Sequence, residues 1–422
     1  RGTWYAHASV GTLHVRPVLN LKLDQDVKKM RAIAEETFEM VREYKGSHSG
    51  EHGDGIVRSE FHTAMFGERI VSAFGEVKHA FDPGNRLNPA RIVDPPRMDD
   101  RSLFRFNPGY SPDEPNMALD WSSWGGFSSA VEMCNNNGAC RKLSGGTMCP
   151  SFRATRDEQH STRGRANVLR LALSGQLGSN PLASHDMRES LKFCLACKAC
   201  RLECPTGVDM AKMKIEVMRQ QIRENGLSWR DRLIGFFPRY APWMARAPYI
   251  ANLQSSFIGS KIIEWLFALA SEQPLPRWSR RPFYPESPLV GDRNGPEVAL
   301  FIDCFNRYFE PDNLHAAVEV LVSSGRRVRF IEPIGDSARP LCCGRTFLSV
   351  GLVEEARREA SRLVEATSRC IERDVPIIGL EPSCVFTLRD ELPELSADGA
   401  HVARRTFLIE EYLMKEFREG RL

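Results

Sequence analysis

Residues 194–205 read CLACKACRLECP, a run of four cysteines with the spacing C-x2-C-x2-C-x3-C-P. In this spacing three thiolates hold one iron-sulfur cube, and the fourth, just before proline, reaches a second cluster. A structural zinc knot or a disulfide framework is the alternative, and the specificity of the spacing weighs against both. The run therefore predicts a chain that carries electrons through iron-sulfur clusters.

A second cysteine group lies upstream and is unequal to the first. Cys134 and Cys140 fit the first and third positions of the same spacing. Asn137 stands at the second position, and Cys149 comes five residues later than the fourth. In two-cluster ferredoxins the fourth cysteine of each group binds the cluster held by the other group. The same exchange here gives one complete 4Fe-4S site. The thiolates of that site are Cys149, Cys194, Cys197 and Cys200.

The other site then has only three thiolates, those of Cys134, Cys140 and Cys204. It is either a 3Fe-4S centre, a cube with a non-cysteine or exchangeable ligand, or an empty vestige. Asn137 is a poor iron ligand by hardness and charge. We expect an incomplete but occupied second cluster.

Length and composition narrow the class of protein. The 422 residues leave room for about three domains. The 57 basic and 54 acidic residues leave a net charge of only +3, which does not indicate a nucleic-acid partner. Seven of the twelve cysteines fall in metal-type clusters, which favours a reducing compartment and thiolate ligands over disulfides.

No apolar run reaches the 18 residues of a membrane span, and the chain opens without a signal peptide. The sequence therefore predicts a cytoplasmic protein, with a peripheral position at the inner face of the membrane as the alternative. Because the first residue is not methionine, we expect the chain to be a fragment of a longer protein. It gives no indication of its oligomeric state, and a homo-oligomer is compatible with it.

The first hundred residues contain a β-type run and a polar glycine-rich loop. His7 and His14 are seven residues apart, and Gly11 between them permits a bend that would converge them. Residues 24–44 show helical spacing of apolar side chains. The loop that follows, residues 46–55, holds Glu51 among four glycines, a composition typical of a binding or catalytic site.

His7, His14, the run Gly50-Glu51-His52-Gly53 and the run 81–89, FDPGNRLNP, resemble the C-terminal domain of FAD-linked oxidases of the vanillyl-alcohol oxidase type. The nearest members are the D-2-hydroxy-acid dehydrogenases, including those for D-2-hydroxyglutarate. The resemblance implies a divalent metal, Zn or Mn, held by His7, His14 and Glu51. It also implies that His52 is catalytic beside the substrate, and that Asn88 is a cofactor-binding residue.

Chemistry independently allows this metal site, because two imidazoles and one carboxylate leave positions open for a substrate hydroxyl or carboxylate. Purely structural histidines are the alternative. The half that binds FAD in such enzymes has no counterpart here, since nothing resembles a glycine-rich pyrophosphate cradle. Alone, the chain should hold FAD poorly.

Residues 130–225 resemble the α-helical ferredoxin domain of iron-sulfur subunits. Between its two cysteine groups lies Ser161-Thr162-Arg163-Gly164-Arg165, where a hydroxyl can cap a helix. Arg163 and Arg165 would raise the potential of a nearby anionic cluster, or else are solvated arginines at a helix start. Residues 226–292 are rich in Trp, Phe, Pro and Arg, and we expect short helices that pack on another domain rather than on a membrane surface.

From residue 293 the pattern alternates strand and helix, which argues for a parallel α/β sheet. Strands are expected at 298–302, 328–331 and 376–380, and helices at 314–323 and 353–372. The run Cys342-Cys343-Gly344 resembles the CCG module of heterodisulfide reductases and related proteins. A cluster there would use Cys304, Cys342, Cys343 and Cys384, and a thiol redox pair or structural cysteines are the alternatives. Glu381 stands where a further cysteine would be expected.

The predicted fold is thus a multidomain α+β protein: an α+β oxidase C-terminal domain, an all-α two-cluster ferredoxin domain and an α/β CCG domain. Its expected segments are 1–98, a linker at 99–129, 130–225, a helical connector at 226–292, and 293–422.

The predicted function is part of a flavin- and iron-sulfur-dependent D-2-hydroxy-acid dehydrogenase that passes electrons to a quinone or redox protein. The main alternative is a non-catalytic electron-transfer subunit. A redox or iron sensor is the third, although no DNA-reading segment is present.

Overall fold

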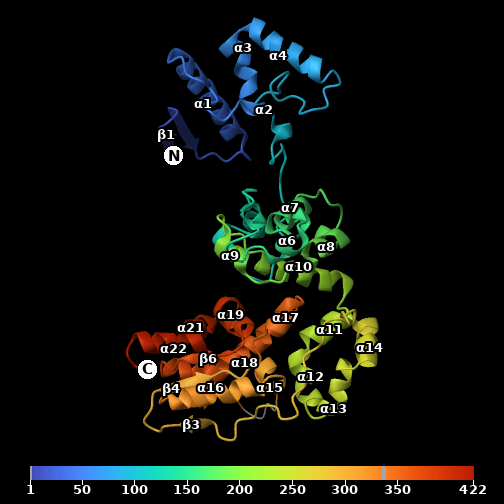
Figure 1. Cartoon of the computed structure of the whole chain (residues 1–422), viewed down its shortest axis with the longest axis vertical. Coiled ribbons are helices and arrows are strands. Elements are labelled where there is room, and N and C mark those ends of the chain that lie inside the picture. Colours follow the sequence, from blue (N-terminus) through green and yellow to red (C-terminus); the bar gives the residue numbers. More distant parts are fainter. Residues whose placement is uncertain (1, 335–338) are drawn as a thin grey trace. The chain divides into compact units, whose positions relative to one another are not determined.

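The computed structural model describes residues 2–334 and 339–422, which fall into two compact units that divide between Ser111 and Pro112. Figure 1 labels the elements. The first unit contains β1 (Gly2–His7), β2 (Thr12–Pro17), α1 (Asp24–Glu43), α2 (Gly55–Arg58), α3 (His62–Phe66) and α4 (Glu68–Phe81). The mixture of helices and sheets across the chain agrees with the predicted multidomain α+β class.

The first unit is a β-hairpin and a set of helices. β1 and β2 pair antiparallel, with Gly2 opposite Pro17 and His7 opposite Thr12. The expected single β-type run is therefore a hairpin whose first strand begins near the start of the chain. The helix α1 matches its predicted span, and its side chains Val27 and Phe38 are buried.

The second unit begins with helices around the cysteine groups. They are α5 (Phe127–Glu132), α6 (Pro150–Thr155), α7 (Thr162–Leu173), α8 (His185–Lys192), α9 (Ala199–Glu203) and α10 (Met210–Asn225). Ser161 caps α7 by accepting a hydrogen bond from the Gly164 amide at 2.9 Å, as its sequence predicts. One apolar core contains side chains of α5, α7 and α10 together with several of the cysteines.

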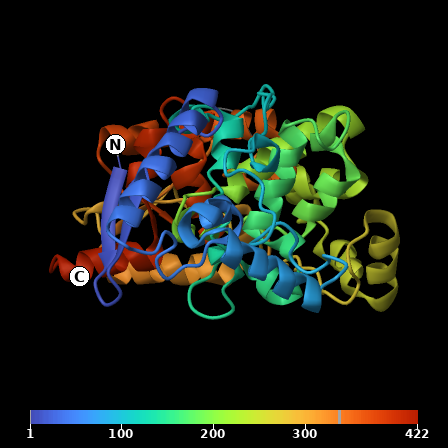
Figure 2. The same cartoon turned by 90° about the horizontal axis from the view of Figure 1, so that it is seen from above.

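Four helices follow, namely α11 (Trp229–Gly235), α12 (Phe237–Met244), α13 (Pro248–Ala251) and α14 (Phe257–Phe267). Both views show these yellow-green to yellow helices gathered in one group (Figures 1 and 2). Within the described residues, no helix combines the length and apolar character needed to cross a bilayer.

A five-stranded sheet organises the last part of the chain, in the order β3-β5-β4-β6-β7. The strands are β3 (Leu289–Gly291), β4 (Glu297–Leu300), β5 (Arg327–Phe330), β6 (Ile377–Gly379) and β7 (Thr406–Leu408). The pairs β4–β5, β4–β6 and β6–β7 are parallel, whereas β3 runs antiparallel to β5 at one edge. The expected parallel pairing therefore holds for the inner strands.

Helices cover both faces of this sheet because successive strand residues point to opposite sides. They are α15 (Cys304–Tyr308), α16 (Pro311–Ser323), α17 (Arg345–Ser349), α18 (Val353–Glu372), α19 (Pro382–Asp390), α20 (Leu392–Leu395), α21 (Gly399–Arg405) and α22 (Ile409–Arg418). Ala299 and Ile377 pack with side chains of α18 on one face. Leu300 and Ile378 pack with Leu314 of α16 on the other face.

Candidate functional site

Two histidines meet at the turn of the β1–β2 hairpin. His7 ends β1, and His14 lies on β2 opposite Tyr5. Gly11, in the turn, has a φ of 66°, a left-handed conformation that favours glycine. The Nε2 atoms of His7 and His14 lie 3.2 Å apart. The bend expected at Gly11 therefore brings the two imidazoles together.

The loop between α1 and α2 adds an acidic side chain and a third imidazole. The Oε1 atom of Glu51 contacts Nδ1 of His7, and Nε2 of His52 lies 3.6 Å from the same oxygen. One ring nitrogen from each of His7, His14 and His52 falls within 4.8 Å of the others. The four polar side chains predicted for metal binding and catalysis are thus neighbours.

The electrostatics of this cluster suit a cation. Partial burial, and then the positive charge that His7 and His52 could carry, lower the pKa of His14. A neutral imidazole keeps a ring nitrogen free to coordinate. Two facing imidazoles beside a carboxylate form the kind of donor set that binds a divalent metal such as zinc. The Tyr5 ring stacks on His14 with centroids 4.4 Å apart and supports the ring from one side.

Asn88 lies in the loop after α4 with a φ of 48°. The carboxylate of Asp82 fixes this loop by accepting the backbone N–H groups of Arg86 and Leu87, each at 2.9 Å. In the part of the first unit that the structure describes, no hydrogen bond or ring contact joins Asn88 to the histidine cluster. Its cofactor-binding role stays a prediction.

A pocket that the sequence did not predict lies between α1 and the α2–α3 segment. His48, Asp54, Phe61 and His62 are among the residues that line it. His62 is buried, and its Nε2 lies 3.0 Å from Oδ2 of Asp54. Burial, and then the charge of Arg58, lower the pKa of His48. The sequence feature that could have indicated this pocket is Asp54, which closely follows Glu51 and His52 in the same polar loop.

In the second unit, one hollow is lined by the four thiols predicted for the complete cube, Cys149, Cys194, Cys197 and Cys200. Cys149 directly precedes α6, whereas Cys200 lies within α9, 51 residues further along the chain. Burial, and then the charge of Asp209, raise the pKa of Cys200 to about 12. Four thiols around one space fit the ligand set of an iron-sulfur cube.

A buried arginine lies beside this hollow. Arg165 of α7 is only 1% exposed. Its guanidinium donates to the Ser190 carbonyl at 2.8 Å and to the Ser151 hydroxyl at 3.0 Å, and its Nη1 lies 3.7 Å from Sγ of Cys149. A fixed positive charge next to a thiolate ligand raises the potential of a cluster. Of the two expectations for Arg165, proximity to the cysteines is the one that the geometry supports.

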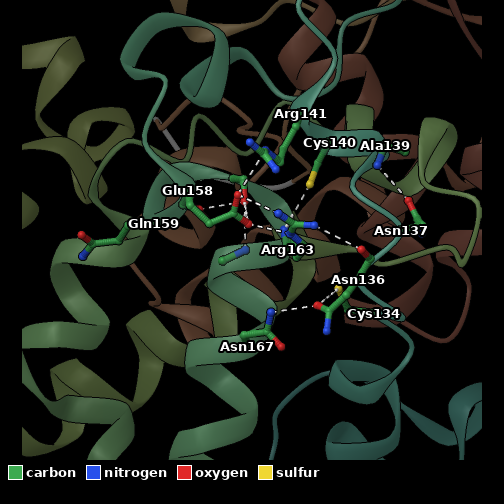
Figure 3. A network of polar contacts seen from close by, with 12 residues as sticks. Cys134, Asn136, Asn137, Ala139, Cys140, Arg141, Glu158, Gln159, Arg163 and Asn167 are labelled. Carbon is green, nitrogen blue, oxygen red and sulfur yellow. Dashed lines mark hydrogen bonds and ion pairs between the residues drawn. The ribbon is translucent and has the colours of Figure 1, made fainter. Parts of the chain in front are cut away.

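The unequal cysteine group has a polar network of its own (Figure 3). The backbone N–H of Arg163 donates to Sγ of Cys140 at 3.4 Å, and the Arg163 guanidinium donates to Glu158 and to the Asn136 carbonyl. The Asn137 side-chain oxygen accepts the Ala139 N–H at 2.8 Å. Asn137 is therefore engaged within its own loop.

Cys204, the third predicted thiolate of this site, follows α9 and lies 3.4 Å from the Thr206 hydroxyl. It packs against the same apolar core as Cys134 and Cys140. Its place in the incomplete site remains a prediction.

The CCG cysteines converge at the carboxyl end of the sheet. Cys304 follows β4, and Cys384 follows the neighbouring strand β6, so both leave the same edge. The Sγ atoms of Cys343 and Cys384 lie 3.1 Å apart. A hydrogen bond with Cys342, together with burial, raises the pKa of Cys304 well above that of a free thiol. All four sulfurs are buried, which fits a cluster or a thiol redox pair.

The Glu381 side chain is engaged at the start of α19. Its carboxylate caps α19 by accepting the Ser383 N–H at 3.1 Å and the Ser383 hydroxyl at 2.6 Å. Asp303, directly before Cys304, was not predicted as a site residue. It is 1% exposed, and its Oδ2 accepts a hydrogen bond from Nδ2 of Asn306 at 2.8 Å. Its position directly before Cys304, at the end of a predicted strand, is the sequence feature that could have identified it as a site residue.

Comparison with protein families gives two matches. Residues 1–92 match the C-terminal domain of FAD-linked oxidases, and residues 130–208 match the 4Fe-4S dicluster domain. The resemblances to these two families, and the predicted cofactor classes FAD and 4Fe-4S, are thereby confirmed. No solved structure matches the chain.

The chain is similar to curated proteins from several bacteria. It is 30% identical to D-2-hydroxyglutarate dehydrogenase of Pseudomonas putida, over 97% of this chain and 44% of that protein. The corresponding protein of Escherichia coli K12 is 26% identical over 92% of this chain and 42% of its own length. One subunit of the anaerobic glycerol-3-phosphate dehydrogenase of E. coli K12 is 25% identical over 51% of this chain and 52% of its own length. The chain thus spans less than half of the D-2-hydroxyglutarate dehydrogenases it matches.

Proposed function

We propose that the chain is part of a D-2-hydroxy-acid dehydrogenase that depends on FAD and iron-sulfur clusters, with D-2-hydroxyglutarate as the substrate it suits best. The observation that carries the proposal is the meeting of His7, His14, Glu51 and His52 at one hairpin turn. The similarity to two D-2-hydroxyglutarate dehydrogenases over more than nine-tenths of the chain supports the same function.

His7, His14 and Glu51 would hold a divalent metal, Zn or Mn, which when bound polarises the 2-hydroxyl of the substrate. His52, beside Glu51, takes the hydroxyl proton. FAD, when bound, would supply the acceptor for the hydride of C2, and the oxidised product would be the 2-oxo acid. The exposed side of the cluster, where the His7 and His52 side chains are 38% and 41% accessible, leaves room for the substrate to approach.

The electrons would then pass through the cysteine sites to a quinone or a redox protein. Cys149, Cys194, Cys197 and Cys200 would hold the complete 4Fe-4S cube, supported by the hollow that they line. Cys134, Cys140 and Cys204 would hold an incomplete second cluster. The third site, supported by the 3.1 Å approach of Cys343 and Cys384, would use the four CCG cysteines.

The finer organisation belongs to the same proposal. An oxidase C-terminal domain, a helical ferredoxin domain and an α/β CCG domain would follow one another, within the segments that the sequence predicts. The cytoplasm would be the compartment, since reduced thiols are required to hold these clusters. A homo-oligomer remains compatible with the chain.

The metal site can be tested on the chain itself. Isothermal titration with Mn²⁺, which thiolates bind weakly, should give one site, and His14→Ala should weaken it by roughly 100-fold because a ligand is lost. His79→Ala, a histidine at the end of α4 in the same unit, is the matched control and should bind as before. Equal affinity of the three proteins would contradict the metal site.

The reaction is tested in the longer protein that includes an FAD-binding half. Flavin reduction by D-2-hydroxyglutarate, followed in a stopped-flow spectrometer, should slow by about 100-fold or more in His52→Ala, because the base is lost. His185→Ala, an exposed histidine of α8, should reduce flavin at the normal rate. Metal removal should stop the reaction, and added Zn or Mn should restore it.

A second candidate function is that of a non-catalytic electron-transfer subunit. The similarity over half of the chain to one subunit of a glycerol-3-phosphate dehydrogenase favours it. In that case flavin reduction would be unchanged by His52→Ala and by chelation, whereas reoxidation through the clusters would still depend on the cysteines.

A further inference from the structure

The helices α11–α14, with the short turn between α13 and α14, carry many exposed apolar side chains, a set here called the aromatic face. Trp265 and Phe257 of α14 are 83% and 81% exposed, and α14 has no buried residue at all. The face consists of Trp229, Trp243, Tyr249, Ile250, Leu253, Phe257, Ile258, Ile262, Trp265 and Leu266, all exposed. Soluble proteins rarely expose so many large apolar side chains together unless they contact a partner.

The same helices already have an inner face that is packed. Phe237 and Ala241 of α12 and Ala251 of α13 are buried in one core with Trp278 and Tyr308. The expected packing of these short helices is therefore satisfied without the aromatic face. None of the side chains of the aromatic face belongs to this core.

Arginines accompany the exposed aromatic rings. The guanidinium of Arg246 lies 4.6 Å from the centre of the Trp243 ring. Similar contacts join Arg280 to Tyr249 at 4.8 Å and Arg232 to Trp229 at 5.7 Å. Such pairs keep a cation at the edge of an apolar surface, where it can meet an anion.

The charge around the face is one-sided. Residues 226–281 contain three acidic side chains, Asp231, Glu264 and Glu272. They contain eight basic ones, namely Arg230, Arg232, Arg239, Arg246, Lys261, Arg277, Arg280 and Arg281. Seven of these eight are exposed, all except Arg239. The excess of five positive charges in this segment is larger than the net charge of +3 of the whole chain, so the segment that carries the aromatic face is basic.

We propose that the aromatic face docks onto the surface of an anionic lipid bilayer. Trp and Tyr favour the level of the lipid headgroups, and the apolar side chains of a surface helix insert shallowly beneath them. Exposed arginines beside those rings attract anionic lipids. This charge pattern favours an anionic surface, and short helices broken by prolines suit a shallow contact rather than a span.

The face is joined to a redox site by packing. Phe237 and Ala241, on the inner side of the same helix group, belong to one core with Cys304 and Cys342. Docking would therefore hold the CCG cysteines close to the bilayer, where a quinone dissolves. This last step rests on the proposed electron-transfer function, whereas the docking itself does not.

The test is flotation of the purified 422-residue chain with vesicles. The chain should float with vesicles of phosphatidylcholine containing about 30% phosphatidylglycerol, and binding should fall several-fold with pure phosphatidylcholine or in high salt. The double variant Phe257→Ser/Trp265→Ser should reduce the bound fraction at least about tenfold. Phe417→Ser, an exposed aromatic residue on α22, is the matched control and should bind normally.

A second measurement guards against misfolding of the variants. Tryptophan fluorescence should shift to the blue on vesicles and should be quenched by lipids brominated on their acyl chains, and circular dichroism should be the same for all variants. The proposal is overturned if the chain does not float with anionic vesicles, or if both variants float equally. It is also overturned if the parent chain does not bind vesicles but self-associates in the ultracentrifuge, and the double variant does not self-associate. None of these readouts requires dehydrogenase activity.

Discussion

Asn137 is the residue that separates the two cysteine groups. Its side-chain oxygen accepts the Ala139 N–H, and its amide nitrogen donates to the Asn135 side chain at 2.6 Å. Both ends of the amide are therefore used to shape the loop between Cys134 and Cys140. This geometry favours a cluster that is one ligand short over one in which asparagine replaces the thiolate.

Replacing Asn137 should therefore leave the iron content almost unchanged. We expect Asn137→Ala, purified without oxygen, to keep the iron and sulfide of the parent chain, because the lost contacts are local to the loop. Cys140→Ser should lower both, since it removes a proposed ligand. Colorimetric iron and sulfide assays, with EPR spectra of both variants, provide the measurement. A loss of iron in Asn137→Ala as large as that in Cys140→Ser would mean that the asparagine is a ligand.

The carboxyl group of Asp82 should make the stability of the first unit depend on pH in the acid range. The Lys78 ammonium group, and then the N–H groups of Arg86 and Leu87, lower the pKa of Asp82 from 3.8 to about 2. A carboxyl whose pKa is lower in the folded state stabilises the fold above its unfolded pKa. That stabilisation is lost as the pH falls from 3.8 towards 2.

The variant Asp82→Asn should remove this pH dependence. Urea unfolding of the first unit, followed by circular dichroism between about pH 2 and pH 5, should show a smaller fall in stability for the variant than for the parent chain. Asp94→Asn, an exposed aspartate in the following loop, is the control and should behave as the parent does. Parallel pH profiles for all three proteins would show that Asp82 contributes nothing.

A buried carboxylate of the helix α10 helps to anchor the long irregular segment that precedes α5. Glu216 is 2% exposed. It accepts the N–H groups of Ala118 and Leu119 at 3.0 and 2.7 Å and the indole N–H of Trp121 at 3.2 Å. The segment before α5 has no strand partner there, so Glu216 satisfies donors that would otherwise be buried without an acceptor.

Removal of this carboxylate should destabilise the second unit. We expect Glu216→Ala to lower the free energy of unfolding by about 2–4 kcal/mol, because three donors, two of them buried, lose their acceptor. Glu224→Ala, an exposed position on the same helix, should change it by less than about 0.5 kcal/mol. Chemical denaturation of both variants measures the difference, and equal stabilities would contradict the anchoring role.

The long periodic helices and the short inner strands β4, β5 and β6 were predictable from the sequence, whereas the edge strands β3 and β7 were not. The helix α18 spans the 20 residues from Val353 to Glu372, as its apolar spacing predicts. The strands β3 and β7 have three residues each at the two edges of the sheet, and they were not predicted because they lack the fully buried apolar run that marks β6. Their pairing is determined by neighbours far along the chain, since β7 joins the sheet beside β6.

The candidate sites show the same division. The grouping of Cys149 with the run that begins at Cys194 was predictable, because the crossed ligand pattern is written in the spacing. The polar pocket at His48 and His62 was not, because it depends on how α1 packs against α3. Spacing in the sequence predicts ligands that lie close along the chain or follow a known pattern. Sites formed by the packing of separate elements cannot be predicted in this way.

The two units of the molecule carry different chemistry. The histidine cluster lies in the first unit, and all twelve cysteines lie in the second, each without a disulfide. In the proposed function, proton removal and electron storage would therefore belong to separate units. The second unit in turn contains two sets of neighbouring thiols, one around the hollow beside α9 and one at the carboxyl end of the sheet.

Double substitutions can determine which thiols share a cluster across the whole chain. Cys149→Ser and Cys200→Ser should each remove about four irons, and the double variant should lose no more than either, because one cube needs both ligands. Combining Cys149→Ser with Cys384→Ser should instead give the sum of two losses, since these residues belong to different sites. Iron per chain, measured after anaerobic purification, is the readout. Additive losses for Cys149 and Cys200 would mean that the crossed ligand pattern is wrong and that the two cysteine groups ligate separately.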